Sequence, residues 1–104
     1  MAARARTALA AAEGLTERAM FGGLAFMLHG NMVCGVVGDE LMLRLGREGA
    51  ERALAGPHAR PMDFTGKPLA GMVFVEPAGL AGAALDRWVG EAVAYVRTLP
   101  PKPA

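Results

Sequence analysis

This chain of 104 residues has almost no excess of positive over negative charge, a single cysteine and few aromatic side chains. Lys and Arg number 11 against 10 Asp and Glu, which leaves a net charge of +1. That balance argues against direct binding of nucleic acid, because phosphate contacts need a positive surface. The single cysteine, Cys34, excludes an intrachain disulfide, and no apolar run typical of a secretion signal precedes Glu13. We therefore expect a protein of the reducing cytoplasm.

Long uninterrupted apolar runs are also missing. Residues 19–38 carry no formal charge and have the length of a membrane span, but His29, Gly30 and Asn31 lie at the middle. Polar groups at that depth are costly in lipid, whereas a hairpin accommodates them, so we expect no membrane association. The composition, 53% hydrophobic and 20% charged, is typical of one globular domain. Its ordered core is expected over about residues 2–99, followed by a tail at 100–104.

The clearest local signals are two turns that contain glycine. Gly30-Asn31 and Gly38-Asp39 each separate two apolar runs of strand length, which is a strong indication of hairpins. Together they predict three consecutive antiparallel strands, at residues 24–29, 32–37 and 40–45. Shorter strands are predicted at residues 16–21, 61–64 and 71–76.

Helices are predicted around these strands. Alanine-rich residues 2–12 favour a first helix, and residues 47–55 favour a short second helix that ends before a Gly-Pro pair. Between Leu85 and Val96 apolar residues recur at helical spacing, with Trp88 on the stripe and expected in the core. The predicted fold is an α+β domain with an antiparallel sheet, a meander of three or four strands plus two more. N-terminal, middle and C-terminal helices give the order α-β(3-4)-α-β(2)-α.

The two-residue loops fix the strand register and hence the faces of the predicted sheet. Both faces are largely apolar, although an antiparallel sheet in a small monomer usually has one wet face. Either the helices divide between the two faces, or one face is a surface for a second copy or another protein. The second interpretation predicts a homodimer. Its candidate interface consists of Leu24, Phe26, Leu28, Val33, Val37 and Met42.

Few residues suggest chemistry. His29 and Cys34 share a predicted face with Met27 and Met32, and soft ligands of this kind can hold monovalent copper. The same residues are more typical of a core in which methionine fills gaps and a free cysteine is inert. No paired metal-ligand spacing is present. Cys34 with His29 or His58 could form a nucleophile and base, but a thiol in the middle of a core strand is normally inert. We expect no catalytic residue, no metal and no cofactor. A small-ligand or metal-binding module on the His29/Cys34 side is the alternative function.

Two segments carry a resemblance to a known family. Met20, Phe21, Gly22 and Gly23 precede the first hairpin, and the third predicted strand reads LMLRL. This pairing resembles the N-terminal domain of the TfoX/Sxy family, from about residue 16 to residue 99. The remaining matching features are Gly30, Asp39, the Arg60-Pro61-Met62 segment and the closing helix. The chain departs from the family pattern in two places: the basic residue, Arg18, lies one position further from the motif, and Met42 replaces a tyrosine.

The resemblance implies a fold similar to secretion-chaperone-like domains, which often dimerise. It also implies a non-enzymatic interaction domain, because the family's competence regulators act with a protein partner, the cyclic-AMP receptor protein. Those regulators carry a second, helical domain for which 104 residues leave no room. We therefore expect a stand-alone protein that acts as an accessory in transcription control. No catalytic residue follows from the resemblance.

Overall fold

The computed structural model describes residues 2–10, 14–20, 22–61 and 71–100. Six strands form one antiparallel sheet in the order β1-β2-β3-β4-β6-β5. The strands are β1 (Leu15–Met20), β2 (Gly23–Leu28), β3 (Asn31–Val37), β4 (Glu40–Arg44), β5 (Ala59–Pro61) and β6 (Met72–Val75). The helices are α1 (Ala2–Leu9), α2 (Gly46–Leu54), the 3-10 helix η1 (Pro77–Leu80) and α3 (Ala84–Val96).

The predicted α+β class and the predicted element order are confirmed. The strand expected at residues 16–21 is the edge strand β1, and the meander therefore has four strands. Of the strand expected at 61–64, only Pro61 is described, as the end of β5; residues 62–64 lie outside the described part. The short helix η1 was not predicted, and its proline at the first turn is typical of helix starts.

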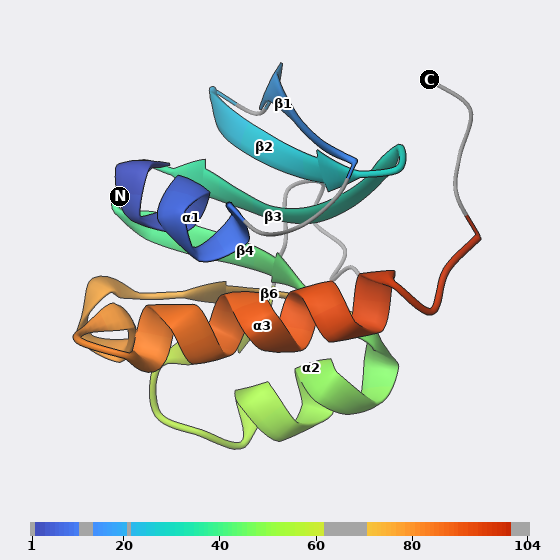
Figure 1. Cartoon of the computed structure of the whole chain (residues 1–104). Coiled ribbons are helices and arrows are strands. Elements are labelled where there is room, and N and C mark those ends of the chain that lie inside the picture. The colour runs from blue at the N-terminus through green and yellow to red at the C-terminus, as the bar shows by residue number, and fades with distance from the viewer. Residues whose placement is uncertain (1, 11–13, 21, 62–70, 101–104) are drawn as a thin grey trace.

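All three α-helices lie on the same side of the sheet (Figure 1). Their buried residues join one core cluster with β-sheet residues, through Ala5 and Leu9 of α1, Ala50 of α2 and Val89 of α3. Helix α3 packs on α1, β3 and β4, whereas α2 packs on β5 and β6. The interpretation that the helices divide between both faces is therefore wrong for the described helices.

The N-terminal helix is also tied to the segment before α3. The guanidinium of Arg4 donates a hydrogen bond to the carbonyl oxygen of Leu80 at 2.7 Å. This contact joins α1 to a residue 76 positions later in the sequence. None of the described helices combines the length and the hydropathy that crossing a membrane requires.

The hairpin between β3 and β4 has the predicted register. Val36 pairs with Leu41, and Gly35 pairs with Met42. The loop is Gly38-Asp39, and Gly38 has a φ of +61°, a left-handed conformation that glycine adopts without strain. The sequence prediction is confirmed here because a single pair of turn residues separates two strands of matched length.

The hairpin between β2 and β3 differs from the prediction by one residue. Leu28 pairs with Asn31, so the loop is His29-Gly30 and not Gly30-Asn31. His29 and Gly30 have φ angles of +48° and +83°, which is the two-residue turn that matches strand twist. Asn31 is instead buried at the start of β3, where its amide donates a hydrogen bond to the Pro100 carbonyl at 2.9 Å. Next to the loop, residues of β2 therefore pair two positions earlier on β3 than predicted, and a bulge between Phe26 and Met27 reduces this difference to one position.

The predicted sheet faces must be corrected accordingly. Phe26 pairs with Cys34, so both side chains point toward the helices. Of the six residues of the candidate interface, four belong to or pack against the main core: Leu24, Phe26, Leu28 and Val33. Only Val37 and Met42 lie in the cluster on the opposite face. The six residues therefore do not form one surface.

The family motif lies at the turn between β1 and β2. Met20 ends β1, Gly22 has a φ of +74°, and Gly23 begins β2 opposite Met20. Phe21 lies outside the described residues. A β-carbon on Gly23 would lie 2.0 Å from the carbonyl oxygen of Val36 on β3, closer than atoms can approach. The second glycine of the motif thus lets β2 and β3 approach each other at their shared end.

The sheet face opposite the helices carries a smaller cluster around Met42 and Phe74. The guanidinium carbon of Arg60 lies 4.5 Å from the centre of the Phe74 ring, a cation–π arrangement. The same guanidinium donates two hydrogen bonds to the carboxylate of Glu40, and this contact raises the pKa of Arg60 further. Met42 and Phe74 are 1% and 4% exposed, so neither offers a docking surface by itself.

Candidate functional site

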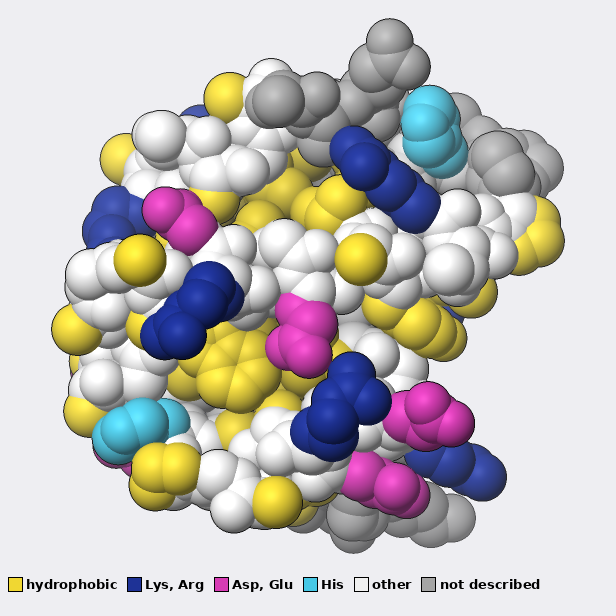
Figure 2. All heavy atoms as spheres, turned by 60° about the horizontal axis from the view of Figure 1, so that its bottom comes forward, with side chains coloured by type: hydrophobic (Ala, Val, Ile, Leu, Met, Phe, Trp, Pro, Cys, Tyr) yellow, Lys and Arg dark blue, Asp and Glu magenta, His cyan; other side chains and the backbone are white. Residues whose placement is uncertain are grey.

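A groove follows the flank of α3 that faces α2, with His58 and η1 lining one end and α2 lining the other. It consists of two hollows of about 610 Å³ and about 450 Å³. The first is lined by His58, Ala78, Gly79, Ala84, Arg87, Trp88 and Glu91. The second is lined by Leu45, Gly46, Arg47, Glu48, Gly49, Arg52, Glu91, Ala94 and Tyr95. Figure 2 shows this side of the molecule, with a hydrophobic floor surrounded by charged side chains of both signs.

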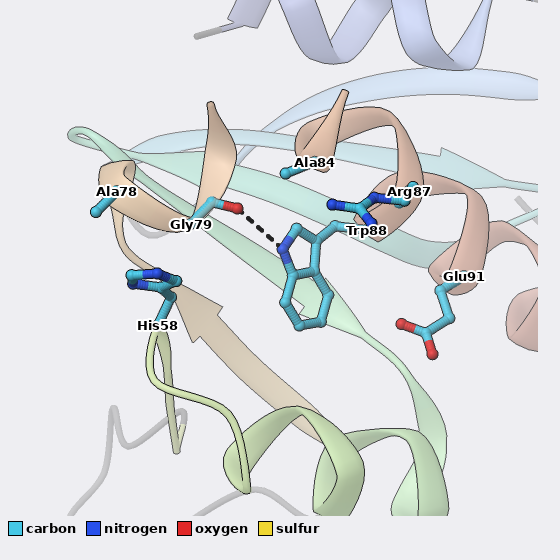
Figure 3. A pocket seen from close by; sticks show the side chains of 7 residues that line it. All are labelled: His58, Ala78, Gly79, Ala84, Arg87, Trp88 and Glu91. Atoms are coloured by element: carbon cyan, nitrogen blue, oxygen red, sulfur yellow. Dashed lines mark hydrogen bonds between the residues drawn. The ribbon is translucent and has the colours of Figure 1, made fainter. Parts of the chain in front are cut away.

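Trp88 forms the floor of the first hollow. The buried stripe of α3 consists of Leu85, Val89, Ala92 and Val96, and Trp88 lies beside it, partly exposed. Its indole N–H donates a hydrogen bond to the Gly79 carbonyl at 3.1 Å, which fixes the ring. Figure 3 shows the ring extending into the space between His58 and Glu91. The expectation of a core tryptophan is thus wrong in part: Trp88 lies at the margin of the core and lines a hollow.

Of the charged side chains that line the first hollow, one has an ion-pair partner and another has none among the described contacts. Glu91 forms an ion pair with Arg52 across the groove at 3.5 Å, with both side chains largely exposed. The guanidinium of Arg87 has no ion pair or hydrogen bond among the contacts of the described residues. His58 Nδ1 is buried without a hydrogen bond from any described residue, and the nearest Glu76 oxygen lies 3.5 Å away. Within the described part of the chain, the hollow therefore combines a fixed aromatic ring with a guanidinium group, that of Arg87, that lacks a partner.

Tyr95 has the corresponding position in the second hollow. Its ring packs directly on Gly46, where a β-carbon would lie 2.4 Å from it. Arg47 lines the same hollow, and Arg44 lines an adjoining depression with Gly46 and Tyr95. Neither arginine has a partner among the described contacts. This end of the groove thus repeats the combination of an aromatic ring and unpaired guanidinium groups.

The family model of the TfoX N-terminal domain matches residues 7–95 of the chain. The chain belongs to the TfoX N-terminal domain family. The matched range contains the glycine motif, all six described strands in full and the greater part of α3, so both hollows lie within it. No curated protein and no solved structure matches the chain.

This TfoX N-terminal domain keeps the two residues of the alternative site in different environments. Cys34 is fully buried in β3, and burial raises the pKa of its thiol to about 12. His29 is exposed in the β2–β3 turn, with its ring against Gly14. Among the described residues, no group of three or more His, Cys, Asp or Glu side chains is placed to hold a metal ion. Geometry therefore gives the alternative function no support.

The buried thiol leads to a prediction about reactivity. At pH 8 we expect Cys34 of the folded protein to react at least about 100-fold more slowly with Ellman's reagent than in urea, because the thiolate is the nucleophile. The raised pKa has a second consequence, since an unfolded thiol ionises near pH 9 and the folded one near 12. Its contribution to stability is therefore complete below pH 9 and is lost as the pH rises toward 12. Rapid reaction of the native protein would contradict the burial of Cys34.

The sequence did not single out the groove, although a signal for it exists. Trp88, Glu91 and Tyr95 recur at i, i+3 and i+7 on α3, next to the purely apolar stripe. Such a mixed stripe of aromatic and charged residues on one helix indicates a margin between core and solvent. The contribution of α2 and η1 to the hollows depends on tertiary packing and has no local signature.

Proposed function

We propose that this TfoX N-terminal domain is a non-enzymatic interaction domain whose contact surface is the groove between α2 and α3. The observation that carries the proposal is the partly exposed Trp88, fixed by Gly79 at the floor of a hollow, beside the unpaired Arg87. Tryptophan and arginine in such settings supply most of the binding energy at protein interfaces. An indole whose N–H is already bonded offers its ring face to a partner without losing a hydrogen bond.

The biological role that fits this surface is that of an accessory in transcription control, acting through a protein partner. Membership of the TfoX N-terminal domain family supports it. The overall charge of +1 favours a protein partner over direct contact with nucleic acid. A homodimer and a cytoplasmic location remain predictions. Sedimentation at high protein concentration tests the dimer, and a dimer built on the six residues named from sequence would have to expose Phe26, which is 0% exposed.

The proposed function is tested by affinity capture from the cells in which the protein is native. The tagged wild-type chain is compared with Arg87→Glu, a change of one exposed side chain that reverses its charge. We expect the partner to be recovered at least about ten-fold less with this variant, since a central interface arginine commonly contributes 1–2 kcal/mol. Arg18→Glu, on the exposed edge strand β1, is the matched control.

Thermal melts establish that both variants are folded before the recoveries are compared. Recovery of the same partner at wild-type yield by Arg87→Glu and by a folded Trp88→Ala chain would refute the groove as the contact surface. Loss of the partner with Arg18→Glu alone would move the surface to β1.

A further inference from the structure

The spacing of the two hollows restricts what can occupy the groove. Trp88 and Tyr95 lie seven residues apart on α3, which is about 10.5 Å along the helix axis. Each ring lines a separate hollow, and Glu91, midway between them, lines both. The Arg52–Glu91 ion pair crosses the groove at this midpoint. An occupant that fills both hollows must therefore present two apolar groups about 10 Å apart on one face.

A helical segment satisfies this condition and a β-strand does not. Side chains at positions i and i+7 of a helix lie on one face and repeat at about 10.5 Å. In an extended strand the same distance is about three residues, and residues three apart point to opposite faces. A helix lying along α3 therefore places both apolar side chains in the groove together, whereas a β-strand does not.

The charges at the two ends of the groove favour an acidic occupant. Arg87 stands at the first hollow, and Arg47 and Arg44 stand at or beside the second. None of these three has a partner among the described contacts. The acidic residues that line the hollows are Glu91, already paired with Arg52, and Glu48. Unpaired cations thus exceed unpaired anions, which attracts and orients a segment of opposite charge.

We infer that the groove binds an acidic amphipathic helix of a partner protein, with apolar side chains seven residues apart and Asp or Glu beside them. This inference rests on the proposed function and adds the kind of partner. The two apolar side chains stack on Trp88 and Tyr95, one on either side of the Arg52–Glu91 pair. The carboxylates of the bound helix pair with Arg87 at one end and with Arg47 at the other.

The test uses the full chain and a display library of cross-linked helical peptides of about 18 residues, five turns, with every exposed position randomised. Selected peptides are then titrated against the protein while its emission is recorded, and Trp88 is the only tryptophan in the chain. We expect enrichment of large apolar residues at i and i+7, an excess of Asp and Glu, and a shift of Trp88 emission on binding. Arg87→Glu should weaken binding at least about ten-fold, and Arg18→Glu less than about two-fold.

Several outcomes overturn the inference. The selected peptides could lack the i, i+7 pattern or be rich in basic residues, or the library could show no enrichment above a support without protein. Binding that leaves Trp88 emission unchanged would contradict it as well. A shift of Trp88 emission on concentrating the protein alone would also overturn it, because a second copy would then occupy the groove. If any of these occurs while capture of the native partner still depends on Arg87, the proposed function stands and only the helical, acidic occupant is wrong.

Discussion

Replacing Gly23 with alanine is expected to destabilise the fold by more than about 3 kcal/mol, the upper end of what overpacking usually costs. The added β-carbon would lie 2.0 Å from the Val36 carbonyl oxygen and 3.0 Å from the Val36 carbonyl carbon. Both are backbone atoms of the neighbouring strand, so no side-chain rotation relieves the contact. β2 and β3 would have to separate at this end, with loss of the Leu24–Val36 pairing. Urea denaturation followed by far-UV circular dichroism measures the change.

Gly22→Ala is the matched control, one residue earlier in the same motif. Gly22 has a φ of +74° but no described atom within 4 Å of an added β-carbon. Its alanine variant should therefore lose only about 1–2 kcal/mol, the strain of a left-handed conformation. A Gly23→Ala chain that is as stable as Gly22→Ala would show that β2 and β3 do not approach as closely as described.

Replacing Phe26 with alanine is expected to cost about 3–5 kcal/mol, the usual range for a fully buried phenylalanine. Phe26 is 0% exposed and the largest of the fully buried side chains described. It packs in the core that the sheet forms with all three helices. The loss should be independent of protein concentration, because the affected contacts lie within one chain. Urea denaturation at two concentrations about 50-fold apart checks both statements.

Val37→Ala is the natural comparison, since sequence analysis placed Val37 and Phe26 on the same surface. Val37 is partly exposed in the smaller cluster on the opposite face, and its truncation should cost about 1 kcal/mol or less. If Phe26→Ala instead left monomer stability unchanged and only dissociated a dimer, the face assignment made from sequence would be right and the observed register wrong.

The two hairpins illustrate what the sequence determines and what it leaves open. At Gly38-Asp39 only one register aligns the flanking apolar runs, so local turn rules were sufficient. At the other hairpin His29-Gly30 and Gly30-Asn31 are both plausible loops. In the observed hairpin the loop is His29-Gly30, and the Asn31 amide is buried and bonded to Pro100, 69 residues away, a contact that turn rules do not include. The bulge between Phe26 and Met27 then shifts the pairing by one residue, and because such a shift exchanges the faces of the paired strands, Phe26 lies on the same face as Cys34.

The groove was not predicted for a similar reason. Periodicity assigns the apolar residues of α3 to one buried stripe, and Trp88 fits that stripe as an apolar residue. Which side of the stripe stays open depends on where α2 packs. Because α2 lies on β5 and β6 and not against the flank of α3, Trp88 and Tyr95 keep part of their rings accessible. The side chains of the site could therefore be identified from the sequence of α3. The shape of the groove depends on α2, which lies about 30 residues earlier in the chain.

The contact between α1 and α3 has a consequence for synthesis of the protein in the cell. The Arg4 guanidinium and the Leu80 carbonyl that it binds are 76 residues apart, and α3 begins only after that. On the ribosome, Ala5 and Leu9 of α1 therefore stay without their final neighbours until α3 has been translated. Contacts this distant slow folding, and they keep apolar surface open to chaperones during elongation. We therefore expect the core of the nascent chain to be completed only after α3 has been translated.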